Sequence, residues 1–232
     1  MTPEEDLDEM SATAAATRAG FFETTVGKKI VMAVTGVILA GFLVGHMAGN
    51  LQIFAGATTI NRYGALLHAS DELLWGVRLV LITALILHVR AAVQLYMRKA
   101  AARPVAYAKK ANRASTLASR IMIYSGYALG GFLVYHILHF TTGNAHPDFI
   151  PGDVFHNVTV AFRNPAIAAI YVVAMVFVAM HLSHGLFSFT QSLGLDNPRH
   201  AAWARRAAQI VAVILAAGFI AVPLGVLAGV VR

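Results

Sequence analysis

Apolar residues run through the chain in five long segments separated by polar stretches. The five segments are residues 30–54, 73–97, 121–141, 166–191 and 207–231. Each is long enough to cross about 30 Å of hydrocarbon as a helix that rises about 1.5 Å per residue. The pattern therefore predicts an all-α integral membrane protein with five transmembrane helices.

The composition supports the same fold class. Hydrophobic residues make up 58% of the chain, charged residues make up 12%, and the mean hydropathy is +0.66. A soluble domain carries about 25% charged residues, so this chain is too apolar to be one. The chain has no cysteine, which excludes disulfides, covalently attached c-type haem and iron–sulfur ligation by its own residues. Any iron–sulfur centre would belong to another subunit.

The net charge of +7 reflects 18 lysines and arginines, of which 13 lie on one side of the predicted spans. They precede the first segment, link the second to the third, or link the fourth to the fifth: Arg18, Lys28, Lys29, Arg98, Lys99, Arg103, Lys109, Lys110, Arg113, Arg120, Arg199, Arg205 and Arg206. The positive-inside rule then predicts a protein of the inner (cytoplasmic) membrane with its N-terminus in the cytoplasm and its C-terminus outside. Since topology explains the charge, no nucleic-acid partner is expected.

The chain divides into a predicted cytoplasmic tail, residues 1–28, and a transmembrane domain, residues 29–232. The first 23 residues hold six of the eleven acidic residues and no apolar core, so they are interpreted as a tail and not as a signal peptide. Residues 143–165 contain three prolines and are expected to form a loop outside the membrane.

One pattern occurs twice, 90 positions apart. Thr35-Gly36-x-x-Leu-x-Gly-Phe-Leu-Val-x-His46 in the first segment is matched by Ser125-Gly126-x-x-Leu-x-Gly-Phe-Leu-Val-x-His136 in the third. On a helix that turns about 100° per residue, the first and last residue of each motif share one stripe. Two similar stripes that end in histidine suggest that both face a metal, and in a bilayer this metal is most often haem iron.

Two further histidines, His88 and His181, lie late in the second and fourth segments. The odd segments run outward and the even ones inward, so His46 and His136 lie nearer the outer face and the other two nearer the inner face. We therefore predict a four-helix haem-binding bundle plus a fifth helix. Its two b-type haems would each be held by two histidines, His46 with His136 and His88 with His181.

Other polar residues near these positions leave alternatives open. His139 and His184 lie three residues beyond His136 and His181 and could replace them as ligands, or make polar contacts. Arg90 follows His88 by two residues and could pair with a haem propionate or extend to the lipid headgroups. The remaining histidines lie between the segments and are predicted to be solvated: His68, His146, His156 and His200.

The motifs resemble those of a known family, the di-haem cytochrome b membrane-anchor subunits of succinate:quinone oxidoreductases, the succinate dehydrogenases and fumarate reductases. The similarity covers residues 27–203. It rests on His46-Met-x-x-Asn50, on His88, on Ser125-Gly126 ten residues before His136, and on His181-Leu-Ser-x-Gly-Leu-Phe-Ser-Phe189. In the family the corresponding four histidines ligate two haems b in the pairing given above, and the position of His184 need not be histidine.

The resemblance implies that this chain carries electron transfer and quinone reduction only. The flavin and the succinate site would belong to a flavoprotein subunit, and an iron–sulfur subunit would dock on the cytoplasmic face through residues 98–120 and 199–206. Electrons would pass through the inner and then the outer haem to a membrane quinone, which is typically menaquinone in di-haem members. Membrane lipid and quinone are therefore the other expected partners.

A quinone site needs a group that exchanges protons. Asp71 and Glu72, at the outer start of the second segment, are the candidate acids, and Asn50, Gln52 and His68 are candidate hydrogen-bond partners for a quinone carbonyl. The alternative for the two acids is capping of a helix N-terminus, where carboxylates are favoured. An inner quinone site beside the iron–sulfur subunit is the other alternative.

Two other function classes remain open from the sequence. Intramembrane histidines also relay protons in transporters, although the cores of the first, third, fourth and fifth segments contain no charged residue. The histidines of a haem-free membrane anchor would only pack. An optical spectrum distinguishes the cytochrome, the transporter and the haem-free anchor, because only the cytochrome is expected to hold about two haems b per chain.

Overall fold

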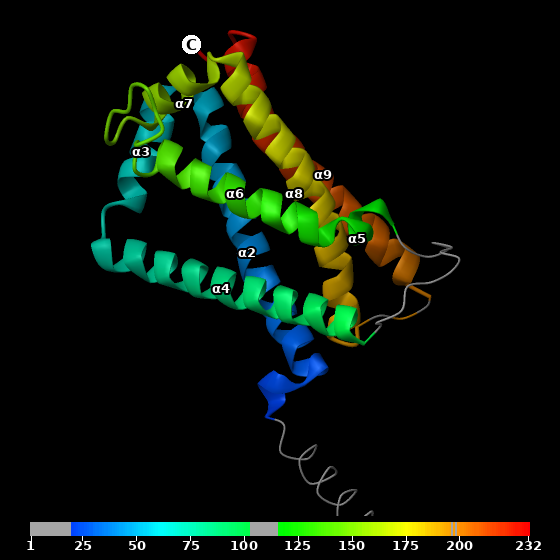
Figure 1. The fold of residues 1–232 in the computed structure, drawn as a ribbon. Coiled ribbons are helices and arrows are strands. Elements are labelled where there is room, and N and C mark those ends of the chain that lie inside the picture. The colour runs from blue at the N-terminus through cyan, green and yellow to red at the C-terminus, as the bar shows by residue number, and fades with distance from the viewer. Residues whose placement is uncertain (1–19, 103–115, 196, 198) are drawn as a thin grey trace, which may run out of the picture.

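The computed structural model describes residues 20–102, 116–195, 197 and 199–232, and within them all regular structure is helical (Figure 1). The elements are η1 (Phe21–Glu23), α2 (Thr25–Leu51), η2 (Gln52–Ala55), α3 (Ala57–Leu67), α4 (Asp71–Ala101), α5 (Leu117–Arg120), α6 (Met122–Phe140), α7 (Val154–Phe162), α8 (Pro165–Ser192) and α9 (Ala201–Leu227). The all-α prediction is confirmed for this part of the chain. Most of the predicted tail, and residues 103–115 of the predicted docking segment, lie outside the described residues.

Four of the described helices are long and apolar enough to cross a membrane, which indicates a multi-pass membrane protein. They are α2 continued by η2, α4, α8 and α9. The third predicted span forms α6, which has only 19 residues and mixes two histidines and three tyrosines into its apolar sequence. For this reason α6 is not among the four.

The long helices form two halves that are joined in the middle, and α8 and α9 run side by side (Figure 1). α2 packs against α4 and α6 packs against α8, while α2 and α8 contact each other and both contact α9 (Figure 1). Large apolar side chains remain exposed along α4, Leu79 and Ile86 among them, as expected for a surface that faces lipid. α9 lies along α8 and α2, so its role in the described structure is packing.

Two short helices, α3 and α7, close the end of the molecule where the C-terminus lies (Figure 1). Asp153 caps α7 by accepting from the backbone N–H of His156 at 2.9 Å. The Asn61 amide on α3 donates to Asp153 Oδ1 at 2.9 Å, and its oxygen accepts from the Phe155 backbone N–H at 2.9 Å. The loop predicted for residues 143–165 therefore contains a helix that is bonded to α3.

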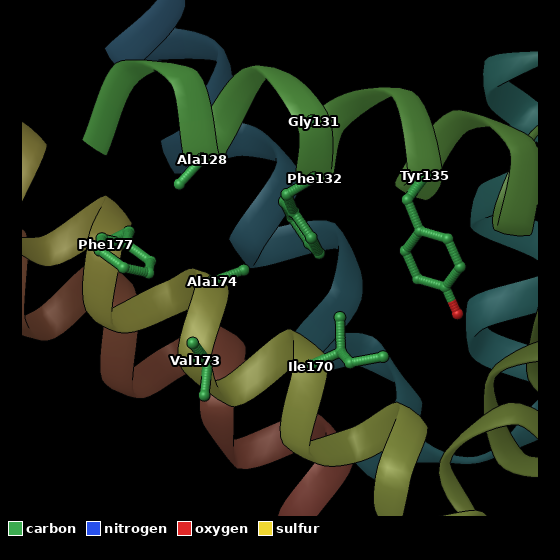
Figure 2. A pocket seen from close by; sticks show the side chains of 8 residues that line it. All are labelled: Ala128, Gly131, Phe132, Tyr135, Ile170, Val173, Ala174 and Phe177. Carbon is green, nitrogen blue, oxygen red and sulfur yellow. The ribbon is translucent and has the colours of Figure 1, made fainter. Parts of the chain in front are cut away.

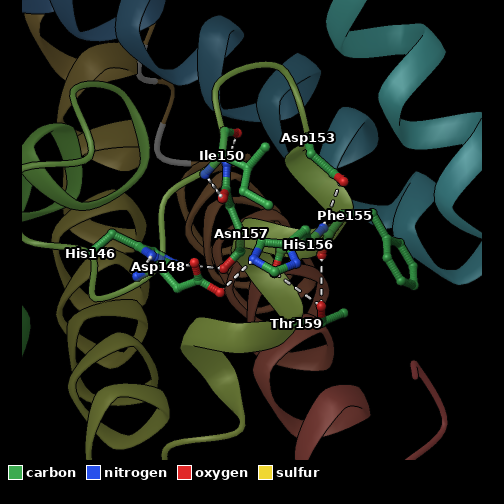
Figure 3. Close-up of polar contacts among 8 residues, drawn as sticks. All are labelled: His146, Asp148, Ile150, Asp153, Phe155, His156, Asn157 and Thr159. Carbon is green, nitrogen blue, oxygen red and sulfur yellow. Dashed lines mark hydrogen bonds and ion pairs between the residues drawn. The ribbon is translucent and has the colours of Figure 1, made fainter.

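The prediction of a solvated His146 is wrong. His146 is 8% exposed, its Nε2 donates to the Asn157 carbonyl at 2.9 Å, and its Nδ1 accepts from the Asp148 backbone N–H at 3.0 Å. Figure 3 shows these residues gathered around Asn157, whose amide also bonds both backbone groups of Ile150. The loop folds back on α7. This contact joins residues 7 to 11 positions apart, and the local sequence pattern does not predict it.

Candidate functional site

The structure brings the four predicted histidines together in two pairs. The rings of His46 on α2 and His136 on α6 have centroids 5.8 Å apart. The rings of His88 on α4 and His181 on α8 have centroids 6.4 Å apart. Each pair joins one helix of the α2–α4 half to one helix of the α6–α8 half. These two cross pairs, α2 with α6 and α4 with α8, are not among the closely packed helix pairs.

The first residues of the two motifs contact the second histidine pair. Thr35 Oγ1 lies 3.2 Å from His88 Nδ1, and Ser125 Oγ lies 3.1 Å from His181 Nδ1. Thr35 is 11 positions before His46, and Ser125 is 11 positions before His136, which is about 16 Å along a helix axis. Each motif therefore supplies a ring to one pair and a hydroxyl to the other, at two separate levels.

These hydrogen bonds fix the tautomers of His88 and His181. Thr35 Oγ1 donates to the Val31 carbonyl at 2.7 Å and Ser125 Oγ donates to the Met122 carbonyl at 2.9 Å, so each hydroxyl oxygen accepts from Nδ1–H. His88 Nδ1 also lies 3.1 Å from the Met32 carbonyl, which only accepts. A neutral imidazole that donates through Nδ1 carries a lone pair on Nε2. Neither Nε2 has a hydrogen-bond partner among the described residues.

Glycines next to the two hydroxyls leave room for the rings. A Cβ at Gly36 would lie 3.3 Å from His88 Cε1, and a Cβ at Gly126 would lie 3.8 Å from His181 Cε1. The first distance is tighter than ordinary van der Waals contact, so a side chain at Gly36 would push the His88 ring away. The Thr-Gly and Ser-Gly steps of the repeat thus both face a histidine of the following long helix.

The pair formed by His46 and His136 is held differently. His46 stacks on Phe42 with centroids 5.2 Å apart, and the Asn50 amide reaches its ring nitrogens only at 3.4 and 3.5 Å while donating to the His46 carbonyl at 2.7 Å. His136 Nδ1 lies 3.4 Å from the Tyr171 hydroxyl. These contacts are longer than those of His88 and His181, so the rings of His46 and His136 are less firmly oriented.

Tyr171 on α8 is a site residue that sequence reasoning missed. Its hydroxyl lies 2.9 Å from Nδ1 of His139, which is fully buried and has an Nε2 with no partner. His139 also stacks on His146, with ring centroids 5.0 Å apart. A tyrosine in an apolar segment gives no local signal, because its role depends on which ring of another helix it meets.

The other alternative residues lie apart from the pairs. His184 makes no hydrogen bond among the described residues, whereas His181 has the Ser125 contact and faces His88. Arg90 is about 200° round the helix from His88, and it lines a cleft with Lys28 and Arg98. The haem-propionate contact of Arg90 stays a prediction. The position of Arg90 on α4, away from the side of His88, does not favour it.

The predicted quinone residues are spread over the end of α2, the end of α3 and the start of α4. Ser70 caps α4 by accepting from Leu73 N, and its hydroxyl donates to Glu72 Oε2 at 2.9 Å. Asp71 and Glu72 are exposed in the first turn of α4, which fits the capping alternative. Gln52 ends α2, and His68 ends α3 with its Nδ1 at 2.8 Å from the Gly64 carbonyl. Of the candidate polar partners, only Asn50 touches a histidine of a pair.

A hollow of about 320 Å³ lies between α6 and α8, with Phe132 and Tyr135 projecting from α6 toward α8 (Figure 2). Its lining is apolar apart from the Tyr135 hydroxyl. It contains no histidine, so the paired rings lie outside it.

The donor set limits which metal species the pairs could hold. The described residues contain no group of three or more His, Cys, Asp or Glu side chains that could hold a metal ion. Each pair supplies two imidazole nitrogens, so a bound metal would take its remaining ligands from outside these side chains.

No protein-family model, curated protein or solved structure matches the chain. A functional assignment therefore has to rest on the histidine pairs, their hydrogen bonds and the motifs that contain them.

Proposed function

We propose that this protein is the membrane-anchor cytochrome b subunit of a succinate:quinone oxidoreductase and that each histidine pair binds one haem b. The observation that carries the proposal is the facing of His88 and His181, whose Nδ1 atoms are both occupied by hydrogen bonds and whose Nε2 atoms have no partner in the described structure. A metal-ligating histidine has this arrangement, with one nitrogen on the metal and the other donating to the protein.

The distances within the pairs fit one iron atom between two rings. A metal–nitrogen bond of about 2 Å on each side, with roughly 1 Å more to each ring centre, separates two axial imidazoles by about 6 Å. The measured centroid distances are 5.8 and 6.4 Å. The two imidazole nitrogens of a pair would complete the coordination of an iron whose other four nitrogens a porphyrin would supply.

The residues around each pair would orient the rings and exclude water. Met32, Thr35 and Ser125 hold the planes of His88 and His181 through Nδ1. Phe42 and Phe219 pack against His46, with ring centroids 5.2 and 5.7 Å away. Bound haem b would supply reversible one-electron transfer, and two histidine ligands leave it no open position for a substrate.

The proposal includes partners that this chain does not contain. The flavoprotein and iron–sulfur subunits would dock on the cytoplasmic side, where the basic residues lie, and a quinone, menaquinone in most di-haem relatives, would be reduced in the membrane. The quinone roles of Asp71, Glu72, Asn50, Gln52 and His68 remain predictions.

The test is a haem count on the purified protein. We expect a pyridine haemochrome assay and a reduced-minus-oxidised spectrum to give about two haems b per chain. His88→Leu and His181→Leu should each remove the same one haem, because each removes one of two axial ligands. His184→Leu, on the same helix, is the matched control and should retain both. A protein without haem, or a His181→Leu variant that keeps two haems, would refute the proposal.

A further inference from the structure

A second polar region lies where α2 begins and α4 ends. It is a cleft of about 580 Å³ lined by residues of η1, α2 and α4, among them Glu23, Lys28, Val31, Leu87, Arg90 and Arg98. The cleft adjoins the region of His88, since Leu87 precedes His88 and Val31 precedes Met32, whose carbonyl lies 3.1 Å from His88 Nδ1. Apart from the predicted propionate contact of Arg90, the proposed haem sites give its lining no role.

The cleft carries an excess of positive charge. Three cations, Lys28, Arg90 and Arg98, face one acid, Glu23, and none of the three forms an ion pair with a carboxylate among the described residues. Lys28 is only 8% exposed, and its Nζ donates to the Phe22 carbonyl at 2.8 Å. A carbonyl satisfies a hydrogen bond but does not balance a buried charge. The site is therefore built for an anion.

The lining also has a polarity gradient along the helices. Val31 lies one turn deeper in α2 than Lys28, and Leu87 lies one turn deeper in α4 than Arg90. Arg98, near the end of α4, is oriented by its contact with Thr25 Oγ1 at 3.3 Å. Cations at the ends of two spans, with apolar side chains directly above them, match an amphiphile with a negative head and acyl chains.

We propose that this cleft binds an anionic phospholipid. Arg90, Arg98 and Lys28 contact its phosphate, and its acyl chains run along Val31 and Leu87 into the membrane. An inorganic phosphate ion offers negative charge but no chains, so it leaves the apolar part of the cleft uncovered. The proposal is independent of haem binding.

The test compares lipids on the purified full-length protein in neutral detergent. Dioleoyl phosphatidylglycerol, dioleoyl phosphatidylcholine and inorganic phosphate are titrated separately, and the bound fraction is measured by native mass spectrometry. We expect the phosphatidylglycerol adduct to saturate first. Phosphate that binds as tightly as phosphatidylglycerol would overturn the lipid assignment, and so would equal binding of the two lipids.

Charge variants locate the site. The double variant Arg90→Gln/Arg98→Gln removes two cleft cations and should weaken phosphatidylglycerol binding about tenfold or more. The matched control Lys29→Gln/Lys99→Gln removes two exposed neighbouring cations that do not line the cleft, and it should weaken binding less than about threefold. If both double variants lost phosphatidylglycerol affinity equally, the lipid would be attracted to the charged surface in general. That result would overturn the assignment of the lipid site to the cleft.

A third variant tests the site with a gain of binding. Glu23→Gln removes the one acid that lines the cleft, so it should strengthen phosphatidylglycerol binding while leaving phosphatidylcholine binding unchanged. This change is at an exposed position, so the protein should fold normally, which circular dichroism checks. Unchanged or weaker phosphatidylglycerol binding in Glu23→Gln would contradict the proposal even if the double variant is unstable.

Discussion

At the scale of single residues, the two motif hydroxyls are not equivalent. His181 Nδ1 has one partner, Ser125 Oγ, whereas His88 Nδ1 has both Thr35 Oγ1 and the Met32 carbonyl. Removal of a hydroxyl therefore leaves His88 with an acceptor and His181 without one. An unpaired N–H in an apolar bundle costs free energy, and it no longer fixes the ring plane.

This difference predicts an order of effects under the proposed function. Ser125→Ala should lower haem affinity about 10- to 100-fold at one centre, and Thr35→Val should lower it less. Haem release to a haem-scavenging protein measures both. Ser183→Ala is the control, because Ser183 Oγ bonds only its own helix, at the Met180 carbonyl. A larger effect from Thr35→Val than from Ser125→Ala would contradict the tautomer argument.

At the scale of elements, the cap made by α3 and α7 depends on one carboxylate. Asp153 accepts from the His156 backbone N–H and from the Asn61 amide, and these two bonds hold the pKa of the Asp153 carboxyl below its ordinary value. A carboxyl whose pKa is lowered in the folded state stabilises that state above its ordinary pKa. The contribution is lost as the pH falls through the lowered pKa.

Substitution of Asp153 should therefore loosen α7. Loss of a helix N-cap costs about 1 kcal/mol, so Asp153→Ala should speed hydrogen–deuterium exchange in α7 about fivefold at neutral pH. In the unchanged protein the same amides should lose protection when the pH falls below the ordinary carboxyl pKa. Asp153→Asn keeps a capping oxygen without a titrating group, so it should keep α7 protected and remove the pH dependence. Equal exchange in all three proteins would exclude the role of Asp153.

At the scale of the whole molecule, α9 lies close to α2 through small residues. A Cβ at Gly225 would lie 2.7 Å from Phe54 Cε1, and a Cβ at Gly218 would overlap the Met47 side chain. Positions 218 and 225, like 47 and 54, are seven apart, so α9 meets α2 at Met47 and its continuation η2 at Phe54 at matching turns. The fifth apolar segment thus joins the bundle without contributing a histidine.

The predicted orientation in the membrane can be tested because the natural chain has no cysteine. Leu66 on α3 and Leu195 after α8 are 70% and 66% exposed at opposite ends of the molecule. A membrane-impermeant maleimide should label Leu66→Cys in intact cells and Leu195→Cys only after permeabilisation. The reverse labelling would invert the topology and move the expected docking face.

The sequence by itself determined the helical class, the apolar spans and the four candidate histidines. Long apolar runs and a repeat at helical spacing depend on local geometry alone, since a helix fixes which residues share a face. The sequence also placed Thr35 and His46 on one stripe, and Ser125 and His136 on another. The sequence did not predict which side chains the Thr35 and Ser125 hydroxyls would contact.

Only the tertiary structure decided those contacts. The Thr35 and Ser125 hydroxyls serve the other histidine pair, Tyr171 joins His136 to His139, and His146 is buried by a returning loop. Each contact spans two elements far apart in the chain, and it depends on helix rotation and crossing, which packing of the whole bundle sets. Local periodicity carries no information about a partner on another helix.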